Sequence, residues 1–170
     1  MILAGDIGGT STRLALFDTN GDRLTIVAGA TFSSTSLSGL GDAIEQFINT
    51  RTRTVKAAGF GLAGPVIAGR VRLPNLSWSI DGQELARQLG LPRVELLNDL
   101  EANAHGIAAL GRDDLVPLHI SARAVRGNAA IISAGTGLGE AGRSPSPLHL
   151  SSPARRPAGA VMADRCIPAP

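Results

Sequence analysis

Apolar residues in the first third of the chain alternate with polar ones at the spacing of β-strands. Apolar runs at 2–5, 12–17 and 24–32 are separated by turn-forming residues. The segment 18–22, Asp-Thr-Asn-Gly-Asp, joins the last two runs, and Asn-Gly tolerates the positive φ that a tight hairpin needs. The pattern therefore predicts two or three strands in antiparallel order.

The hydrophobic period then changes, and amphipathic helices alternate with strands. Helices are predicted over 38–50, 82–89 and 100–110, and strands over 55–63, 69–73, 94–97 and 128–133. Ser38 and Asp81 are the expected N-caps of the first two helices, and Gly111 is the expected C-cap of the third. This order of elements indicates an α/β fold, with a mixed sheet and flanking helices.

Composition favours a soluble cytoplasmic protein with its own core. Hydrophobic residues make up 44% of the 170, which excludes global disorder. Cys166 is the only cysteine, so an intrachain disulfide is excluded and a reducing compartment is expected. The N-terminus lacks the charged and apolar regions of a signal peptide, and no run approaches the about 20 apolar residues that span a membrane.

The basic character of the chain comes from its end. The formal net charge is +2, but residues 143–170 hold four Arg against one Asp. Residues 1–142 are therefore slightly acidic, and the charge gives no reason to expect a nucleic-acid partner. The same last segment holds six of the ten prolines and no sustained periodicity, so it is predicted to be disordered or poorly packed.

A glycine pair follows the first apolar run, in the motif Asp6-Ile7-Gly8-Gly9-Thr10. Two glycines in a tight turn let backbone N–H groups approach phosphate oxygens, because no Cβ stands in the way. Thr10 adds a hydroxyl donor, and Asp6 at the strand end could hold Mg²⁺ directly or through water. An ordinary hairpin turn would use the same residues, so both interpretations stay open.

A second glycine-rich segment, Gly135-Thr136-Gly137-Leu138-Gly139, follows the predicted strand 128–133. A flexible turn is the alternative for this segment alone. Two such loops, each after a buried strand, suggest a nucleotide phosphate chain held from both sides. Neither is a Walker loop, since no Gly-Lys-Ser/Thr follows, and neither is a dinucleotide fingerprint that opens a helix.

Two further segments carry candidate ligand groups. Asn98 and Asp99 stand at the end of the strand 94–97, and the carboxyl edge of a sheet is where ligands are contacted. Asp99 could accept a proton from an attacking hydroxyl, or cap the following helix, or do both. In the segment 73–78, Leu-Pro-Asn-Leu-Ser-Trp, Asn75 and Ser77 could bind sugar hydroxyls. Its Trp, the only one in the chain, would either close over a ligand or fill the core.

Together, these segments resemble the motifs of bacterial glucokinases, a family of the hexokinase and actin-like ATPase superfamily. Residues 6–16 resemble the first phosphate motif, 73–78 the sugar loop, 96–106 the segment with the catalytic aspartate, and 131–142 the second phosphate motif. The resemblance implies two lobes with RNase H-like cores. The N-terminal small lobe would span 1–111, and 112–142 would begin the second lobe.

The resemblance also implies an activity, which is transfer of the ATP γ-phosphoryl group to the 6-hydroxyl of glucose with Mg²⁺ as cofactor. Asp99 would be the general base, and Asn98, Asn75 and Ser77 would bind the sugar. The groups around the phosphates would be Asp6, Gly8, Gly9, Thr10, Gly135, Thr136 and Gly137, with Asp6 near Mg²⁺.

The resemblance stops after Gly142, where the family's further sugar and adenosine segments are expected. We therefore expect a truncated or frameshifted product with impaired activity, in which 143–170 is a non-homologous tail. The alternatives are a non-catalytic fragment, a sugar-responsive binding protein, or a kinase for another hexose. The expected partners are glucose and ATP, without nucleic acid or membrane, and the full-length family suggests a homodimer.

Overall fold

The computed structural model describes residues 1–20, 23–49, 54–110, 112–116, 118, 129–134 and 138–143. By its internal contacts the chain divides into two compact units, Met1–Ala102 and Asn103–Pro170. The division falls within one helix, whereas the predicted lobe boundary at residue 111 stays a prediction.

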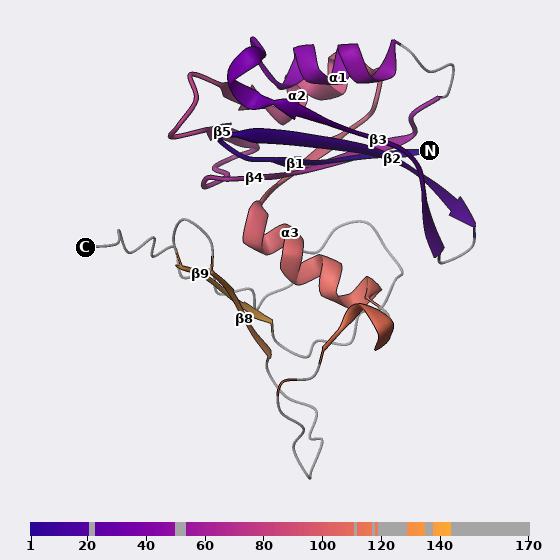
Figure 1. Ribbon diagram of the computed structural model, residues 1–170. Coiled ribbons are helices and arrows are strands. Elements are labelled where there is room, and N and C mark those ends of the chain that lie inside the picture. Colours follow the sequence, from indigo (N-terminus) through magenta and orange to yellow (C-terminus); the bar gives the residue numbers. More distant parts are fainter. Residues whose placement is uncertain are drawn as a thin grey trace. The chain divides into compact units, whose positions relative to one another are not determined.

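The first unit is built on a five-stranded sheet in the order β3-β2-β1-β4-β7 (Figure 1). Its strands are β1 (Ile2–Ile7), β2 (Ser11–Asn20), β3 (Arg23–Ser33), β4 (Ala57–Leu62) and β7 (Val94–Asn98). The first three pair antiparallel, while β4 runs parallel to both β1 and β7. The prediction of an α/β fold with a mixed sheet is confirmed.

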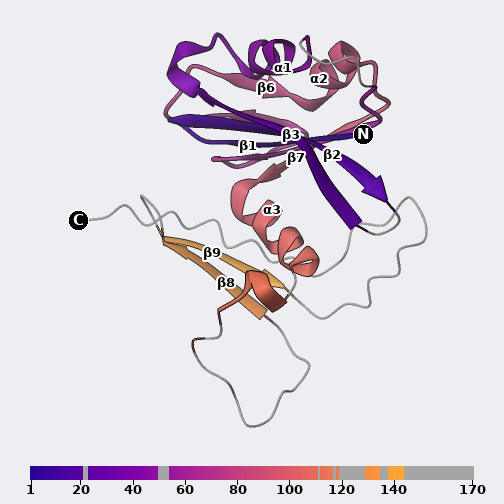
Figure 2. The same ribbon diagram turned by 45° about the vertical axis from the view of Figure 1, so that its right-hand side comes forward.

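Helices lie on both sides of this sheet. In Figures 1 and 2, α1 (Leu40–Ile48) and α2 (Gly82–Leu89) lie on one side, and the first turn of α3 (Asp99–Gly106) lies on the other. The small hairpin of β5 (Arg70–Arg72) and β6 (Ser79–Asp81) precedes α2, and a 3₁₀ turn, η1 (Ser34–Ser36), follows β3.

The hydrophobic core lies between the sheet and the helices α1 and α2. Alternate residues of β1 and β2 point into it, because successive side chains of a strand face opposite sides. The largest side chains that are almost fully buried there are those of Leu3, Ile7, Leu14, Leu16, Phe47, Phe60 and Leu62. Trp78 is only 4% exposed and belongs to the same core, which decides for the core-filling interpretation of this residue.

The predicted helix caps have mixed outcomes. Asp81 is the N-cap of α2, where its carboxylate accepts hydrogen bonds from the N–H groups of Gln83 and Glu84. The prediction of Ser38 as the cap of α1 is wrong, because Gly39 holds that position. Ser38 instead donates from both its N–H and its hydroxyl to the Asp42 carboxylate, each over 3.1 Å.

The third helix is shorter than predicted. It ends at Gly106 and continues as a 3₁₀ turn, η2 (Ile107–Ala109). The change from α-helix to 3₁₀-helix follows Gly106, and glycine has a low helix propensity. The predicted C-cap Gly111 lies outside the described residues.

The second unit contains an antiparallel hairpin of β8 (Ala129–Ala134) and β9 (Leu138–Arg143), and a 3₁₀ turn, η3 (Arg112–Asp114). The strand predicted at 128–133 corresponds to β8, whereas β9 was not predicted as a strand. No helix within the described part of the chain is long and apolar enough to cross a membrane.

Candidate active site

The ends of three parallel strands bring the predicted site segments to one edge of the sheet. Ile7 of β1 pairs with Leu62 of β4, which pairs with Asn98 of β7. The residues that follow each strand therefore leave the sheet at the same level. The first glycine loop and the Asn98-Asp99 pair are thus only one strand apart.

The loop from Gly8 to Thr10 is a tight turn between β1 and β2. The Gly8 N–H donates to the Ser11 carbonyl over 2.9 Å and closes the turn. Within the described part of the chain, the N–H groups of Gly9 and Thr10 have no hydrogen-bond partner. Free N–H groups on a glycine turn are suited to receive an anion.

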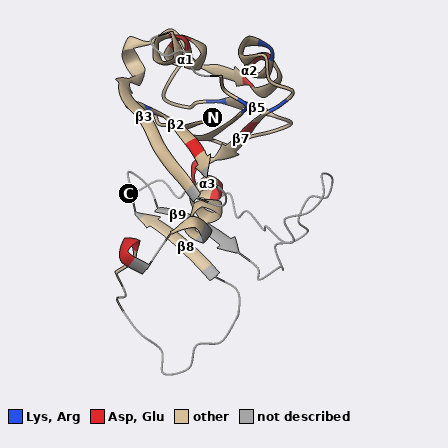
Figure 3. Cartoon of the chain, turned by 90° about the vertical axis from the view of Figure 1, so that its right-hand side faces the viewer, with Lys and Arg blue, Asp and Glu red and all other residues tan. Residues whose placement is uncertain are grey.

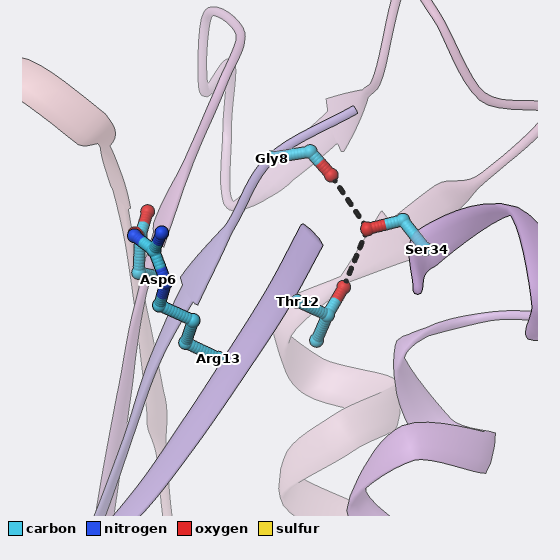
Figure 4. A network of polar contacts seen from close by, with 5 residues as sticks. All are labelled: Asp6, Gly8, Thr12, Arg13 and Ser34. Atoms are coloured by element: carbon cyan, nitrogen blue, oxygen red, sulfur yellow. Dashed lines mark hydrogen bonds and ion pairs between the residues drawn. The ribbon is translucent and has the colours of Figure 1, made fainter. Parts of the chain in front are cut away.

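Two buried hydroxyls hold this loop from behind (Figure 4). Ser34 donates from its hydroxyl to the Gly8 carbonyl over 2.8 Å and from its N–H to the Thr10 carbonyl over 2.9 Å. The hydroxyl oxygens of Thr12 and Ser34 are 2.9 Å apart. Neither residue was singled out from the sequence, because their partnership joins positions 22 residues apart.

Asp6 lies on the opposite face of the sheet from this hydroxyl pair (Figure 4). Its carboxylate accepts a hydrogen bond from Arg13 over 3.1 Å, and both side chains are more than 60% exposed. Within the described residues, no three His, Cys, Asp or Glu side chains gather as a metal site. A single exposed carboxylate fits a magnesium ion that is bound mainly by water and substrate phosphates, which is the usual mode for Mg²⁺.

Asn75 lies beside the glycine loop. A Cβ added to Gly9 would lie 3.2 Å from the Asn75 Cβ, which is closer than an ordinary contact, so a larger residue at position 9 would displace the Asn75 side chain by a few tenths of an ångström. Asn75 and Ser77 are both exposed. The predicted sugar segment and the predicted phosphate loop are therefore neighbours.

Asn98 ties the end of β7 to its surroundings. Its side-chain N–H donates to the Gly64 carbonyl over 3.2 Å, and its side-chain oxygen accepts from the Leu100 N–H over 3.0 Å. One N–H of the amide is left for a ligand. Asn98 is thus partly committed to holding its neighbours in place.

Asp99 opens α3 next to the sheet. Its Oδ1 accepts from the Leu100 N–H over 2.9 Å, so Asp99 and Asn98 share this donor at the start of the helix. The first turn carries the acidic residues Asp99 and Glu101 (Figure 3). A Cβ added to Gly61 would lie 3.7 Å from the Asp99 Cα and 3.1 Å from the Ala102 Cβ. The absence of a side chain at Gly61 in β4 therefore lets the first turn of α3 pack closely against the sheet.

Among the described residues, the carboxyl groups whose pKa is lowered lie away from this edge of the sheet. Hydrogen bonds from Arg70 and the Gln83 N–H lower the pKa of Asp81. Hydrogen bonds from the Ser38 N–H and from Gln46 lower the pKa of Asp42. Asp81 is the N-cap of α2 and Asp42 lies in the first turn of α1, so both shifts arise at helix N-termini and not at the candidate site.

A groove of about 640 Å³ lies elsewhere, between α1 and α2. It is lined by Ser38, Gly41, Asp42, Ile44, Glu45, Ile48, Asn49, Gln88 and Leu89. None of the predicted site residues lines it, so the chemistry is argued from the sheet edge. The predicted second phosphate loop, Gly135, Thr136 and Gly137, lies outside the described residues.

Known proteins of similar sequence are glucokinases. The glucokinase family model matches residues 3–155, which extends past the last motif at Gly142. The glucokinase of Nostoc punctiforme is 37% identical over 142 residues, and that of Synechocystis is 39% identical over 149 residues. The matched regions cover 82% and 81% of this chain but 42% of each relative, so the chain spans less than half their length.

Solved structures show the same fold. The crystal structure of a glucokinase from an Antarctic psychrotroph matches with a TM-score of 0.76 at 29% identity, covering 84% of this chain and 46% of that one. A ROK family glucokinase from Streptomyces griseus, solved with glucose and AMPPNP, matches with a TM-score of 0.57 at 26% identity, covering 83% and 43%. Since the family model covers most of the chain, this protein belongs to the glucokinase family.

Proposed function

We propose that this chain carries the sugar-binding edge and first phosphate loop of an ATP-dependent glucokinase. The reaction transfers the γ-phosphoryl group of ATP to the 6-hydroxyl of glucose. The observation that carries the proposal is the close approach of Gly9 to Asn75, at the sheet edge where Asp99 begins α3. Phosphoryl transfer needs the acceptor hydroxyl and the phosphates side by side, and this edge supplies groups for both.

Asp99 is the proposed general base. Its Oδ1 is bound to the Leu100 N–H, which fixes the carboxylate, and its other oxygen has no hydrogen-bond partner among the described residues. That oxygen would accept the proton of the sugar 6-hydroxyl as the oxygen attacks phosphorus. Asn75, Ser77 and the remaining N–H of Asn98 would orient the sugar hydroxyls.

The phosphates are proposed to lie at the loop from Gly8 to Thr10. The free N–H of Gly9 and the Thr10 hydroxyl would donate to phosphate oxygens. Asp6 would hold Mg²⁺, which neutralises phosphate charge when bound. Gly135, Thr136 and Gly137 would close on the phosphates from the second lobe. The S. griseus relative, solved with glucose and AMPPNP, supports these two ligand classes.

The wider setting is proposed from the family. Residues 1–111 would form the small lobe and 112–142 the start of the second lobe. The enzyme would act in the cytoplasm at the entry of glucose into glycolysis, and the full-length protein would be a homodimer.

A chimeric enzyme tests the proposal. Residues 1–142 of this chain would replace the matching part of the N. punctiforme glucokinase, and glucose phosphorylation with Mg-ATP would be measured by a coupled assay. Mannose and N-acetylated hexosamines would be assayed in parallel. We expect an active chimera with a preference for glucose, whereas the 170-residue chain alone is expected to be impaired.

The base is tested in the same chimera. Asp99→Asn should lower kcat by about 10²–10⁴-fold, because the amide cannot accept the proton. Glu101→Gln is the matched control, since it removes a carboxylate from the same helical turn, and it should leave kcat nearly unchanged. Near-normal turnover of Asp99→Asn would exclude Asp99 as the base, and an inactive parent chimera would contradict the proposed function.

A further inference from the structure

Two completely buried hydroxyl side chains lie directly behind the loop from Gly8 to Thr10. Thr12 on β2 and Ser34 at the start of η1 are both 0% exposed, and they are the buried polar residues of the described part of the chain. Buried polar groups cost free energy unless they are hydrogen-bonded. The partners of these two hydroxyls therefore decide what the pair does.

The direction of each hydrogen bond follows from the number of protons. A carbonyl oxygen only accepts, so the Ser34 hydroxyl donates its single proton to the Gly8 carbonyl over 2.8 Å. The contact of 2.9 Å between Thr12 Oγ1 and Ser34 Oγ then requires Thr12 to be the donor. The result is a relay from Thr12 through Ser34 to Gly8, in which each bond polarises the next.

The relay fixes the orientation of a peptide group in the loop. The described residues contain no cis peptide bond, so the N–H of Gly9 points opposite to the carbonyl of Gly8. Because Ser34 draws the Gly8 carbonyl toward the core, the Gly9 N–H is directed away from it. The bond from the Ser34 N–H to the Thr10 carbonyl holds the other end of the loop.

We propose that the Thr12–Ser34 pair is a positioning device that presents the Gly9 N–H to a phosphate oxygen. This inference rests on the proposed function, which puts ATP phosphates at this loop. Both residues are positioning residues, since fully buried hydroxyls cannot reach the ligand. A donor whose direction is fixed before the ligand arrives binds an anion without paying for reorganisation.

Two substitutions of Thr12 separate positioning from packing. Thr12→Val keeps the shape of the side chain and removes the hydroxyl, whereas Thr12→Ser keeps the hydroxyl and removes a buried methyl group. A purely structural role predicts that the serine variant is the more damaged, because it leaves a cavity. A positioning role predicts that the valine variant binds phosphate less well.

The probe is pyrophosphate, titrated into the ¹⁵N-labelled 170-residue chain while the Gly9 amide resonance is followed by NMR. We expect a saturable shift of this resonance in the wild type and in Thr12→Ser. In Thr12→Val the dissociation constant should rise about fivefold, the effect of losing one hydrogen bond. Ser34→Ala should weaken binding at least as much, and thermal unfolding of each variant would confirm that it folds.

Wild-type affinity in Thr12→Val would overturn the inference, as would an equal loss in Thr12→Val and Thr12→Ser. No response of Gly9 in the wild type would also overturn it. The proposed function is decided separately, by glucose phosphorylation in the chimera. An active chimera with an unaffected Thr12→Val would retain the kinase and remove only the positioning role.

Discussion

Polar residues on the two faces of the β1–β2 hairpin differ in burial: they are buried on the core face and exposed on the opposite, open face. Thr12 and Arg13 are neighbours in β2, yet Thr12 is fully buried and Arg13 is exposed (Figure 4). On the core face, the Thr12 hydroxyl has one fixed partner in Ser34. On the open face, the Arg13–Asp6 ion pair stands in solvent, where both groups are free to change partners. The loop is thus held by buried hydrogen bonds on the core face, whereas the charged groups on the other face are exposed and can change partners.

The largest expected effect is crowding of the core face. A Cβ on Gly5 would lie 2.6 Å from a Phe60 ring carbon and 2.9 Å from Leu14 Cδ2, so Gly5→Ala should lower the free energy of unfolding by about 1–3 kcal/mol. Urea unfolding of the 170-residue chain measures it. Gly59→Ala is the control on the open face, where the new Cβ would meet Glu95 at an ordinary 3.9 Å. Equal losses in the two variants would contradict the difference between the faces.

A smaller effect is expected at Gly61, which lies on the side of the sheet opposite the core, beneath the first turn of α3. Its new Cβ would lie 3.1 Å from the Ala102 Cβ, so the helix must shift by a few tenths of an ångström. We expect Gly61→Ala to cost about 1 kcal/mol of stability and to lower kcat of the chimera more than KM, because Asp99 moves with α3. Unchanged kcat at reduced stability would show that the packing of α3 over Gly61 does not position Asp99.

The helix α2 covers the core side of the sheet, and the pH dependence of stability tests its N-cap, Asp81. Arg70 and the Gln83 N–H lower the pKa of Asp81, so its stabilising effect is complete above about pH 4 and is lost as pH falls below that. Asp81→Asn retains a capping oxygen but does not titrate. Its melting temperature should therefore fall less than that of the wild type between pH 5 and about pH 3. Asp81→Ala should be the less stable variant at neutral pH. Parallel pH profiles for wild type and Asp81→Asn would exclude this account.

The smallest effect is expected for the ion pair on the open face. Arg13→Met should change the free energy of unfolding by less than about 1 kcal/mol, because exposed pairs are screened by water and salt. Urea unfolding at low and high salt measures it. A loss as large as that of Gly5→Ala would mean that the open face is as rigid as the core face.

Much of the fold could be predicted because its signals are local. The alternation in β1 and β2 and the apolar stripe of α1 each depend on residues close in sequence. The Asp81 cap is also local, since its partners are two and three residues away. Ser38 is not the cap because α1 begins at Leu40, which leaves Gly39 in the cap position and Ser38 one residue too early, where it donates to the Asp42 carboxylate instead.

The sequence by itself determined most of the strands, the places of the three helices, the glycine loop and the acidic residue that follows β7. Only the tertiary structure decided that Ser34 and Thr12 support that loop, that Asn75 lies next to Gly9, and that the first turn of α3 packs over Gly61. Each of these contacts joins residues far apart in the chain. Strand pairing and helix packing create them, and a local hydrophobic period contains no information about which distant residue will lie opposite.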